Sequence, residues 1–183
     1  KYWGIDSSVP IILSLGNTRK DKGLDILIEA LNNVNCPFQL LIAGKAEDFD
    51  AEYIREHTKA YSISPIVNLR YLTDEEVELA IIAADIVALP YRFSFNGASG
   101  PLGEGVSHDK CIVGPNHGNL GATIQENHLG YTFETENSYS LAQVLNKALN
   151  QQFVPDKTYI AYKSKLDPRL FTASYMKIFN ELK

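Results

Sequence analysis

The sequence of 183 residues predicts an α/β fold: a doubly wound, mostly parallel six-stranded sheet with helices on both faces. Three observations predict it. Apolar runs and helical segments alternate along the chain. The apolar runs are short and continuous, as in strands buried on both faces, and two end in glycine. The segments between them repeat apolar residues at helical spacing, as at Leu24, Leu27, Leu31 and Val34.

The elements follow in order. Strands are expected at residues 10–16, 38–44, 65–72, 85–90, 110–116 and 129–134. Helices between them are expected at residues 24–34, 46–62, 73–85, 100–108 and 118–127, and further helices at 137–152, 156–166 and 167–183. With no internal repeat or interior linker, residues 1–183 count as one domain. Residues 1–9 resemble the end of a linker, and residues 153–183 form the carboxyl-terminal helices.

Local signals support two of the helix starts. Thr73 is followed three residues later by Glu76, which is the spacing of a capping box. The last helix has Asp167 as its expected N-cap and Pro168 at its first helical position.

Composition narrows the function classes. A net charge of −5 argues against a general nucleic-acid binder, so any anion site has to be local. No apolar run reaches the roughly 18 to 20 residues of a membrane span. The cysteines Cys36 and Cys111 each lie beside an apolar strand, which favours reduced thiols in a cytoplasmic protein. The four histidines show no metal-ligand spacing, and His117, alone in a glycine turn, is explained by ordinary polar surface.

The first candidate site is the turn GNTRKDKG at residues 16–23. Arg19, Lys20 and Lys22 place three positive charges within four positions, where a helix begins. Helix starts normally prefer acidic residues, so this inversion predicts a bound anion. A solvated basic turn explains the residues equally well.

The second candidate site is FNGASGPLGEG at residues 95–105. Ser99 or Gly100 can cap a helix in which Pro101 occupies the first or second position. Its amino end would bind phosphate, and Glu104, one turn further along the face of Gly100, would accept hydrogen bonds from ribose hydroxyls. The alternative is a tight glycine turn followed by an ordinary first-turn acid.

These segments, in this order, resemble the carboxyl-terminal, donor-binding half of retaining glycosyltransferases with the GT-B fold, of the family 4 (group 1) type. GNTRKDKGLDILIEAL resembles the strand–loop–helix that holds the donor diphosphate. NGASGPLGEG resembles the loop and helix that carry the E-x7-E motif, and KCIVGPNHGNLGATI resembles the G-x-P-V strand and its glycine turn. The resemblance spans roughly residues 10–149.

The resemblance implies site residues. Arg19, Lys22 and Glu104 would be the catalytic group, with the two cations neutralising the leaving diphosphate. The other implied donor contacts are Gly16, Asn17, Leu69, Arg70, Asn96, Gly97, Ala98, Ser99 and Gly100. The second glutamate of E-x7-E matches Glu104, whereas the first falls on Asn96, a departure that bears on sugar choice and catalytic competence. An asparagine still donates and accepts hydrogen bonds.

No cofactor or metal is implied, because the donor, a UDP- or GDP-linked sugar, is the substrate. Asp48-Phe49-Asp50 matches the D-x-D of metal-dependent glycosyltransferases of the other major fold. It lies at an acidic helix start, where compensation of the helix dipole explains it.

The implied function is that of the donor nucleotide-sugar-binding domain of a hexosyltransferase. The full-length enzyme would act on a glycan or lipid-linked acceptor in cell-surface polysaccharide synthesis, together with an amino-terminal acceptor-binding domain that this sequence lacks. The full-length enzyme would be cytoplasmic, a location that allows peripheral association with the membrane. The 183 residues alone are expected to be inactive. Two alternatives stay open: a GT-B-like binding or regulatory module without turnover, and an unrelated dinucleotide-binding domain, which the missing glycine fingerprint disfavours.

Overall fold

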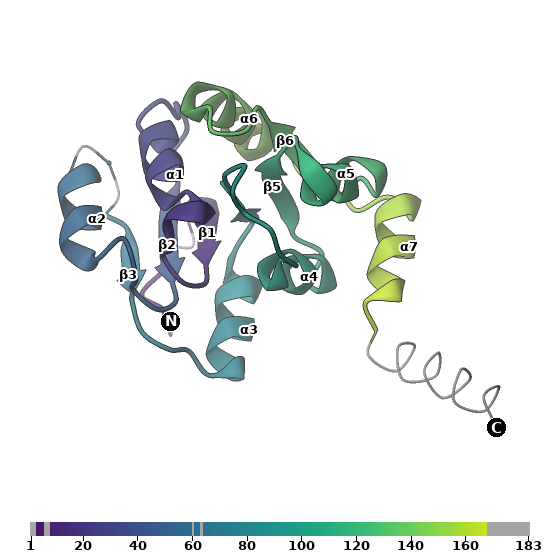
Figure 1. Cartoon of the computed structure of the whole chain (residues 1–183), viewed down its shortest axis with the longest axis horizontal. Coiled ribbons are helices and arrows are strands. Elements are labelled where there is room, and N and C mark those ends of the chain that lie inside the picture. Colours follow the sequence, from purple (N-terminus) through teal and green to yellow (C-terminus); the bar gives the residue numbers. More distant parts are fainter. Residues whose placement is uncertain (1–2, 6–7, 60, 63, 168–183) are drawn as a thin grey trace.

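The computed structural model describes residues 3–5, 8–59, 61–62 and 64–167, and in it six strands form one sheet (Figure 1). The strands are β1 (Ile11–Leu15), β2 (Gln39–Ala43), β3 (Ile66–Asn68), β4 (Ile86–Ala88), β5 (Cys111–Pro115) and β6 (Gly130–Phe133). Their order is β3-β2-β1-β4-β5-β6, and every pairing is parallel. The predicted fold class is therefore confirmed.

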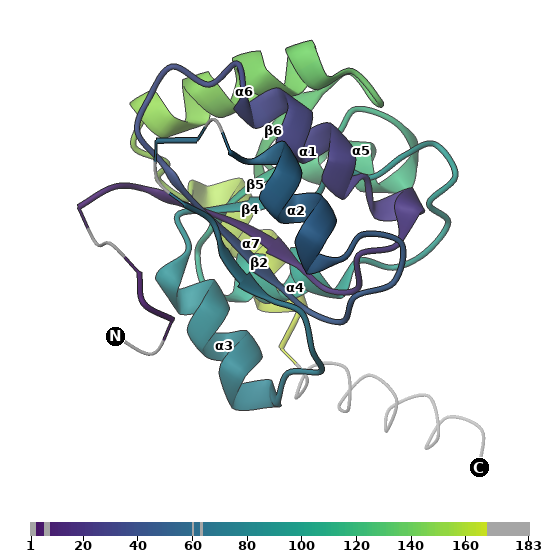
Figure 2. The same ribbon diagram turned by 90° about the vertical axis from the view of Figure 1, so that its left-hand side faces the viewer.

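The helices cover both faces of the sheet. They are α1 (Leu24–Leu31), α2 (Ala51–His57), α3 (Asp74–Ala83), α4 (Gly100–Ser107), α5 (Gly118–Glu126), α6 (Ser138–Asn150) and α7 (Lys157–Lys165), with a short 3-10 turn η1 (Lys20–Lys22) before α1. Figure 2 shows α1, α2 and α6 on one side of the strands and α3, α4 and α7 on the other. Within the part of the chain that the structure describes, no helix is long and apolar enough to cross a membrane.

The four central strands, β1, β2, β4 and β5, are buried on both faces, which is why their sequences read as continuous apolar runs, whereas the edge strands β3 and β6 are partly exposed. Successive side chains of a strand point to opposite faces of the sheet. In β1, Ile12 packs into the core layer with α1 and α6, while Leu13 packs into the layer with α3, α4 and α7. Both side chains are fully buried. On the second face, the α7 residue Tyr159 is fully buried, and its hydroxyl donates to the backbone oxygen of Lys110 at 2.9 Å.

The capping box before α3 is present as predicted, because Thr73 and Glu76 each accept a hydrogen bond from the other's backbone N–H. Other boundaries differ from expectation. The structure starts α2 at Ala51 rather than at residue 46, because Asp50 is the residue that caps it. Strand β3 is shorter than expected, since as an edge strand it pairs only with β2, over three residues. The helix expected over residues 167–183 lies almost wholly outside the described residues.

Candidate functional site

The candidate site lies at the carboxyl edge of β1 and β4. These two strands are neighbours in the sheet, and the strand order reverses between them. In open α/β sheets the loops on either side of such a reversal leave a crevice in which ligands bind. The loops that leave β1 and β4 are the two segments that the sequence singled out, residues 16–23 and 95–105.

Two glycines shape the loop after β1. Gly16 has φ of 109°, and its backbone N–H donates to the Ala43 oxygen at 2.8 Å. Gly23 ends the η1 turn with φ of 65°, and a Cβ built there would lie 2.0 Å from the backbone oxygen of Pro90. Only glycine tolerates both this backbone conformation and this approach. The loop after β1 is thereby held against the segment that leaves β4.

The Lys22 ammonium lies at the centre of this junction. A Cβ on Gly16 would lie 2.6 Å from Lys22 Nζ, and the Tyr91 ring centroid is 5.7 Å from Nζ. Among the described residues, this ammonium has no hydrogen-bond or ion-pair partner. Burial lowers the pKa of Lys22, and the positive charge of Arg19 lowers it further. A partly buried cation without a partner is an arrangement that a bound anion would complete.

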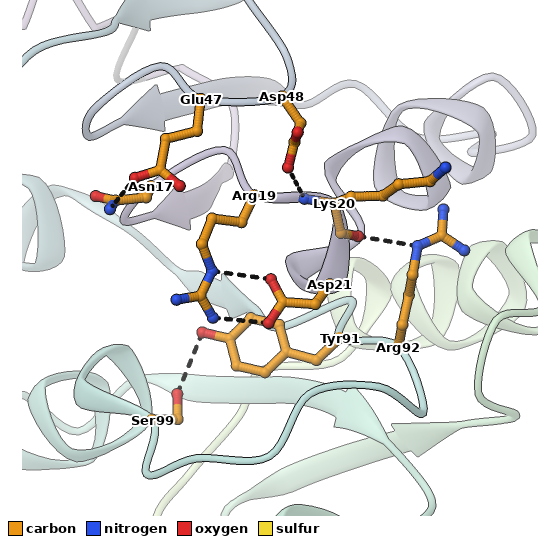
Figure 3. Close-up of polar contacts among 9 residues, drawn as sticks. All are labelled: Asn17, Arg19, Lys20, Asp21, Glu47, Asp48, Tyr91, Arg92 and Ser99. Carbon is orange, nitrogen blue, oxygen red and sulfur yellow. Dashed lines mark hydrogen bonds and ion pairs between the residues drawn. The ribbon is translucent and has the colours of Figure 1, made fainter.

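Arg19, by contrast, is already paired. Its Nε and terminal nitrogen donate to the two carboxylate oxygens of Asp21 at 3.0 and 2.7 Å (Figure 3). These hydrogen bonds raise the pKa of the Arg19 guanidinium, which stays charged. The side chains of Arg19 and Asp21 are 46% and 25% exposed, so the pair lies at the mouth of the crevice.

Backbone contacts join the loop to its neighbours. The Lys20 backbone N–H donates to Asp48 at 2.7 Å, and the Lys20 oxygen accepts from Arg92 Nε at 2.9 Å. The Arg92 guanidinium also forms an ion pair with Asp25. Figure 3 shows the two contacts of the Lys20 backbone, with Asp48 and Arg92, and the Lys20 side chain directed away from Arg19.

The second loop ends in the amino terminus of α4, as the sequence predicted. Ser99 is the N-cap, its Oγ accepting from the Leu102 N–H at 3.3 Å, and Pro101 lies in the first turn. The buried Tyr91 places its hydroxyl 3.3 Å from Ser99 Oγ, and burial raises the pKa of Tyr91 to about 12. Tyr91 therefore contacts both Ser99 at the start of α4 and Lys22 in the first loop.

A cavity of about 400 Å³ lies between the two loops, and we call it the junction cavity. It is lined by Arg19, Asp21, Lys22, Tyr91, Ser94, Phe95, Asn96, Gly97, Ala98, Ser99, Gly100 and Pro101. Seven of the residues predicted from the sequence thus share one cavity: Arg19, Lys22, Asn96, Gly97, Ala98, Ser99 and Gly100. The sequence reasoning missed Asp21 and Tyr91. The signals for them were the only acid in a basic turn and the aromatic residue directly after a buried strand.

The remaining predicted residues lie around this cavity rather than in its wall. Gly16 and Asn17 line a small adjoining hollow with Lys22. Glu104 is exposed on α4, one turn beyond the cavity. Leu69 packs against the core on the face of α1, and Arg70 forms an ion pair with Glu76 at 2.5 Å, so neither reaches the cavity wall.

The D-x-D sequence has two structural roles. Asp48 accepts from the Lys20 backbone, and Asp50 caps α2 by accepting from the Tyr53 N–H at 2.8 Å. Asp50 therefore belongs to the acidic helix start, as predicted, whereas Asp48 precedes the helix. In the described ranges, no cluster of three or more His, Cys, Asp or Glu residues could hold a metal ion.

A larger hollow, of about 470 Å³, lies at the opposite edge of the sheet. Its charged residues are satisfied within the protein. Asp85 accepts from the Ile11 N–H, Lys110 Nζ donates to a backbone oxygen, and Asp109 pairs with Lys163. Although this hollow is larger, its charged groups are already paired. It is therefore a weaker candidate for binding a charged ligand than the junction cavity, where Lys22 is unpaired.

Comparisons with known proteins place the chain among sugar-transferring enzymes. The profile of the family described as "Glycosyl transferases group 1" matches residues 1–166. A glycosyltransferase from Rickettsia africae superposes with a TM-score of 0.77 at 20% identity, over 98% of this chain and 49% of that chain. The carboxyl-terminal domain of a group 1 family protein (LpcC) from Francisella tularensis superposes with a TM-score of 0.61 at 21% identity. The superposition covers 92% of this chain and 88% of that chain.

A third solved structure is that of Anabaena Alr3699/HepE in complex with UDP and glucose. It superposes with a TM-score of 0.69 at 18% identity, over 95% of this chain and 48% of that chain. The chain thus spans about half the length of two of these three structures. A comparison with curated protein sequences found no match.

Proposed function

This chain belongs to the glycosyl transferases group 1 family, and on that premise we propose that it binds the nucleoside diphosphate sugar donor of a retaining glycosyltransferase. The full-length protein would transfer a hexose from a UDP- or GDP-linked sugar to a glycan or lipid-linked acceptor. We also propose that the full-length protein acts in the cytoplasm, in the synthesis of cell-surface polysaccharide, and that its reaction needs no cofactor. Because the chain spans about half of several relatives, an acceptor-binding domain beside it is part of the proposal.

One observation supports donor binding most directly: the partly buried, unpaired Lys22 ammonium in the junction cavity. A diphosphate would supply its missing anionic partner. The amino terminus of α4 opens into the same cavity. Its Gly100 N–H has no acceptor among the described residues, whereas Pro101 has no N–H and the Leu102 N–H donates to Ser99 Oγ. Two independent sources of positive potential therefore face one space of about 400 Å³, a volume typical of small-ligand sites.

In the proposed reaction these groups act on the leaving diphosphate. Lys22 and the α4 amides stabilise the negative charge that develops when the bond to the sugar breaks. Arg19 uses two of its five N–H donors on Asp21, so its remaining donors can contact a phosphate oxygen while the Asp21 carboxylate offsets part of its charge. Asn96, in the cavity wall, contacts the sugar by hydrogen bonds rather than by charge. Glu104 reaches the ribose from the exposed face of α4.

Titration of the chain with UDP and GDP tests the proposal. Lys22→Ala removes a charge-assisted hydrogen bond worth about 1.5 to 3 kcal/mol, so the affinity should fall by roughly 10- to 150-fold. Lys20→Ala is the matched control, since Lys20 belongs to the same turn but is exposed, does not line the cavity, and points away from Arg19 (Figure 3). Equal losses in the two variants, or a change below about threefold at Lys22, would contradict a diphosphate role.

A second candidate function is a binding module that has lost turnover. Two observations favour it: a neutral Asn96 stands where the resembling family has a glutamate, and Arg19 is neutralised by Asp21. The same titration separates the candidates. Nucleotide binding that depends on Lys22 supports the donor-binding domain, whereas a chain that binds neither nucleotide supports the module.

A further inference from the structure

A second hollow, of about 200 Å³, lies beside the junction cavity, and we call it the side hollow. It is bounded by the loop of residues 91–97 and by the start of α5. The two spaces share Tyr91, Phe95, Asn96 and Gly97, but neither Arg19 nor Lys22 reaches the side hollow. Its one charged residue, Arg92, is paired with Asp25. The side hollow therefore suits a neutral group next to the charged donor.

Aromatic rings form one wall of the side hollow. Phe93 is 59% exposed, which is high for a large apolar side chain, and its ring centroid lies 4.6 Å from that of His117. The backbone beneath this ring is fixed, because the Phe93 N–H donates to Glu136 at 3.2 Å. Phe95, which also lines the hollow, packs against the buried Tyr91 with centroids 4.3 Å apart and ring planes tilted by 42°. The wall is an amphipathic surface of the kind that covers an apolar ligand face.

The hydrogen-bond network sets the tautomer of His117. The Thr135 hydroxyl donates its single hydrogen to Asn116 Oδ1 at 3.1 Å, an oxygen that also accepts from the Thr135 N–H. With that hydrogen on Asn116, the hydroxyl oxygen accepts from His117 Nδ1–H, and the two atoms are 2.9 Å apart. In the neutral ring, Nε2 is consequently left with a lone pair, and no described residue donates to it. His117 can therefore accept a hydrogen bond from a ligand hydroxyl.

We propose that the side hollow binds one sugar ring of the glycan acceptor, and this inference rests on the proposed function. A pyranose has a face of C–H groups, which the Phe93 and His117 rings can cover, and a rim of hydroxyls, one of which donates to His117 Nε2. The volume admits a single ring rather than a nucleotide. Asn96 lies in the walls of both spaces, between the donor and the acceptor sugar.

The test uses this chain, NMR titration, and three probes: the methyl glycosides of α-glucose, α-mannose and β-galactose. We expect at least one to bind in the millimolar range and to shift signals of residues 93–97 and 117–119. Phe93→Ala and Phe93→Leu should each weaken binding at least fivefold, because both remove the ring. His117→Phe keeps a ring but loses Nε2, and should weaken binding about two- to fivefold. Ile160→Ala, at a residue 55% exposed on α7, is the control and should change nothing.

UDP and GDP titrations of the same variants separate this inference from the proposed function. Nucleotide binding that persists in Phe93→Ala while glycoside binding is lost supports the acceptor assignment. Failure of all three glycosides, or unchanged glycoside binding in both Phe93 variants, overturns it and leaves nucleotide binding untouched. If Phe93→Ala instead abolishes only the extra affinity of UDP-glucose over UDP, the side hollow belongs to the donor sugar and the acceptor assignment is wrong.

Discussion

Replacing Lys22 with methionine should stabilise the unliganded protein while weakening nucleotide binding. Lys22 has no ionic partner among the described residues, and burial already lowers its pKa, so the folded state bears a desolvation penalty for its charge. Methionine keeps a flexible apolar stem of similar length without that charge. A residue retained for binding is expected to cost stability in this way.

The magnitude follows from two opposing contributions. Relieving strain of this kind at a functional site commonly gains about 0.5 to 2 kcal/mol. The cation–π contact with Tyr91, 5.7 Å from Nζ to the ring centroid, is lost and offsets about 0.5 to 1 kcal/mol. Together these contributions range from a loss of about 0.5 to a gain of about 1.5 kcal/mol, and the midpoint is a gain of about 0.5 kcal/mol. For a chain of this size that midpoint corresponds to roughly 1 to 2 °C in Tm.

Urea and thermal unfolding with and without UDP would measure this. At a nucleotide concentration 100 times the wild-type Kd, binding should stabilise the wild type by about 2.7 kcal/mol. With affinity reduced about 10- to 150-fold, the Lys22→Met variant should be stabilised by only about 0.3 to 1.4 kcal/mol. Lys20→Met is the control and should stay within about 0.5 kcal/mol of the wild type in both conditions. A Lys22→Met variant less stable than the wild type by 1 kcal/mol or more would refute the reasoning, because Lys22 would then be structural.

The pH dependence provides an independent check on the same residue. Burial lowers the Lys22 pKa in the folded protein, so the unfolded chain binds more protons between that value and the ordinary lysine pKa of about 10.4. The stability contributed by Lys22 therefore rises with pH through this window, and its penalty is fully present below it. The difference in unfolding free energy between wild type and Lys22→Met should shrink as pH approaches about 10. A constant difference would exclude the charge as the cause.

Three further predictions concern the scaffold of the site. Ser99→Ala removes the N-cap of α4 and should lower the unfolding free energy by about 1 kcal/mol, measured by urea denaturation. Gly23→Ala places a Cβ within 2.0 Å of the Pro90 oxygen, at a residue whose φ is positive. The positive φ alone costs an alanine roughly 1 kcal/mol, so with the clash the unfolding free energy should fall by more than this, and nucleotide affinity should fall as well. Tyr159→Phe leaves the Lys110 oxygen without its hydroxyl donor and should cost about 1 to 2 kcal/mol in thermal unfolding, with unchanged nucleotide binding.

Much of the fold could be predicted because its signals are local. Apolar runs predicted six strands, and the spacing of Thr73 and Glu76 predicted a helix start; the structure confirms both. The start of α2 was predicted less well. Asp48 and Asp50 are equally good capping residues in sequence, and only the position of the Lys20 backbone N–H draws Asp48 away from the helix.

The sequence by itself determined the α/β class, the helix start at Ser99 and the presence of cations in the loop after β1, since hydrophobic periodicity, capping and charge are properties of neighbouring residues. Only the tertiary structure decided which of those groups are free to bind. Arg19 and Lys22 look equivalent in sequence, yet Asp21 neutralises the first, and the approach of Tyr91 and Gly16 partly buries the second without a partner. The pairing of Phe93 with His117 likewise joins residues 24 positions apart. Such differences depend on through-space distance and desolvation, which no local pattern encodes.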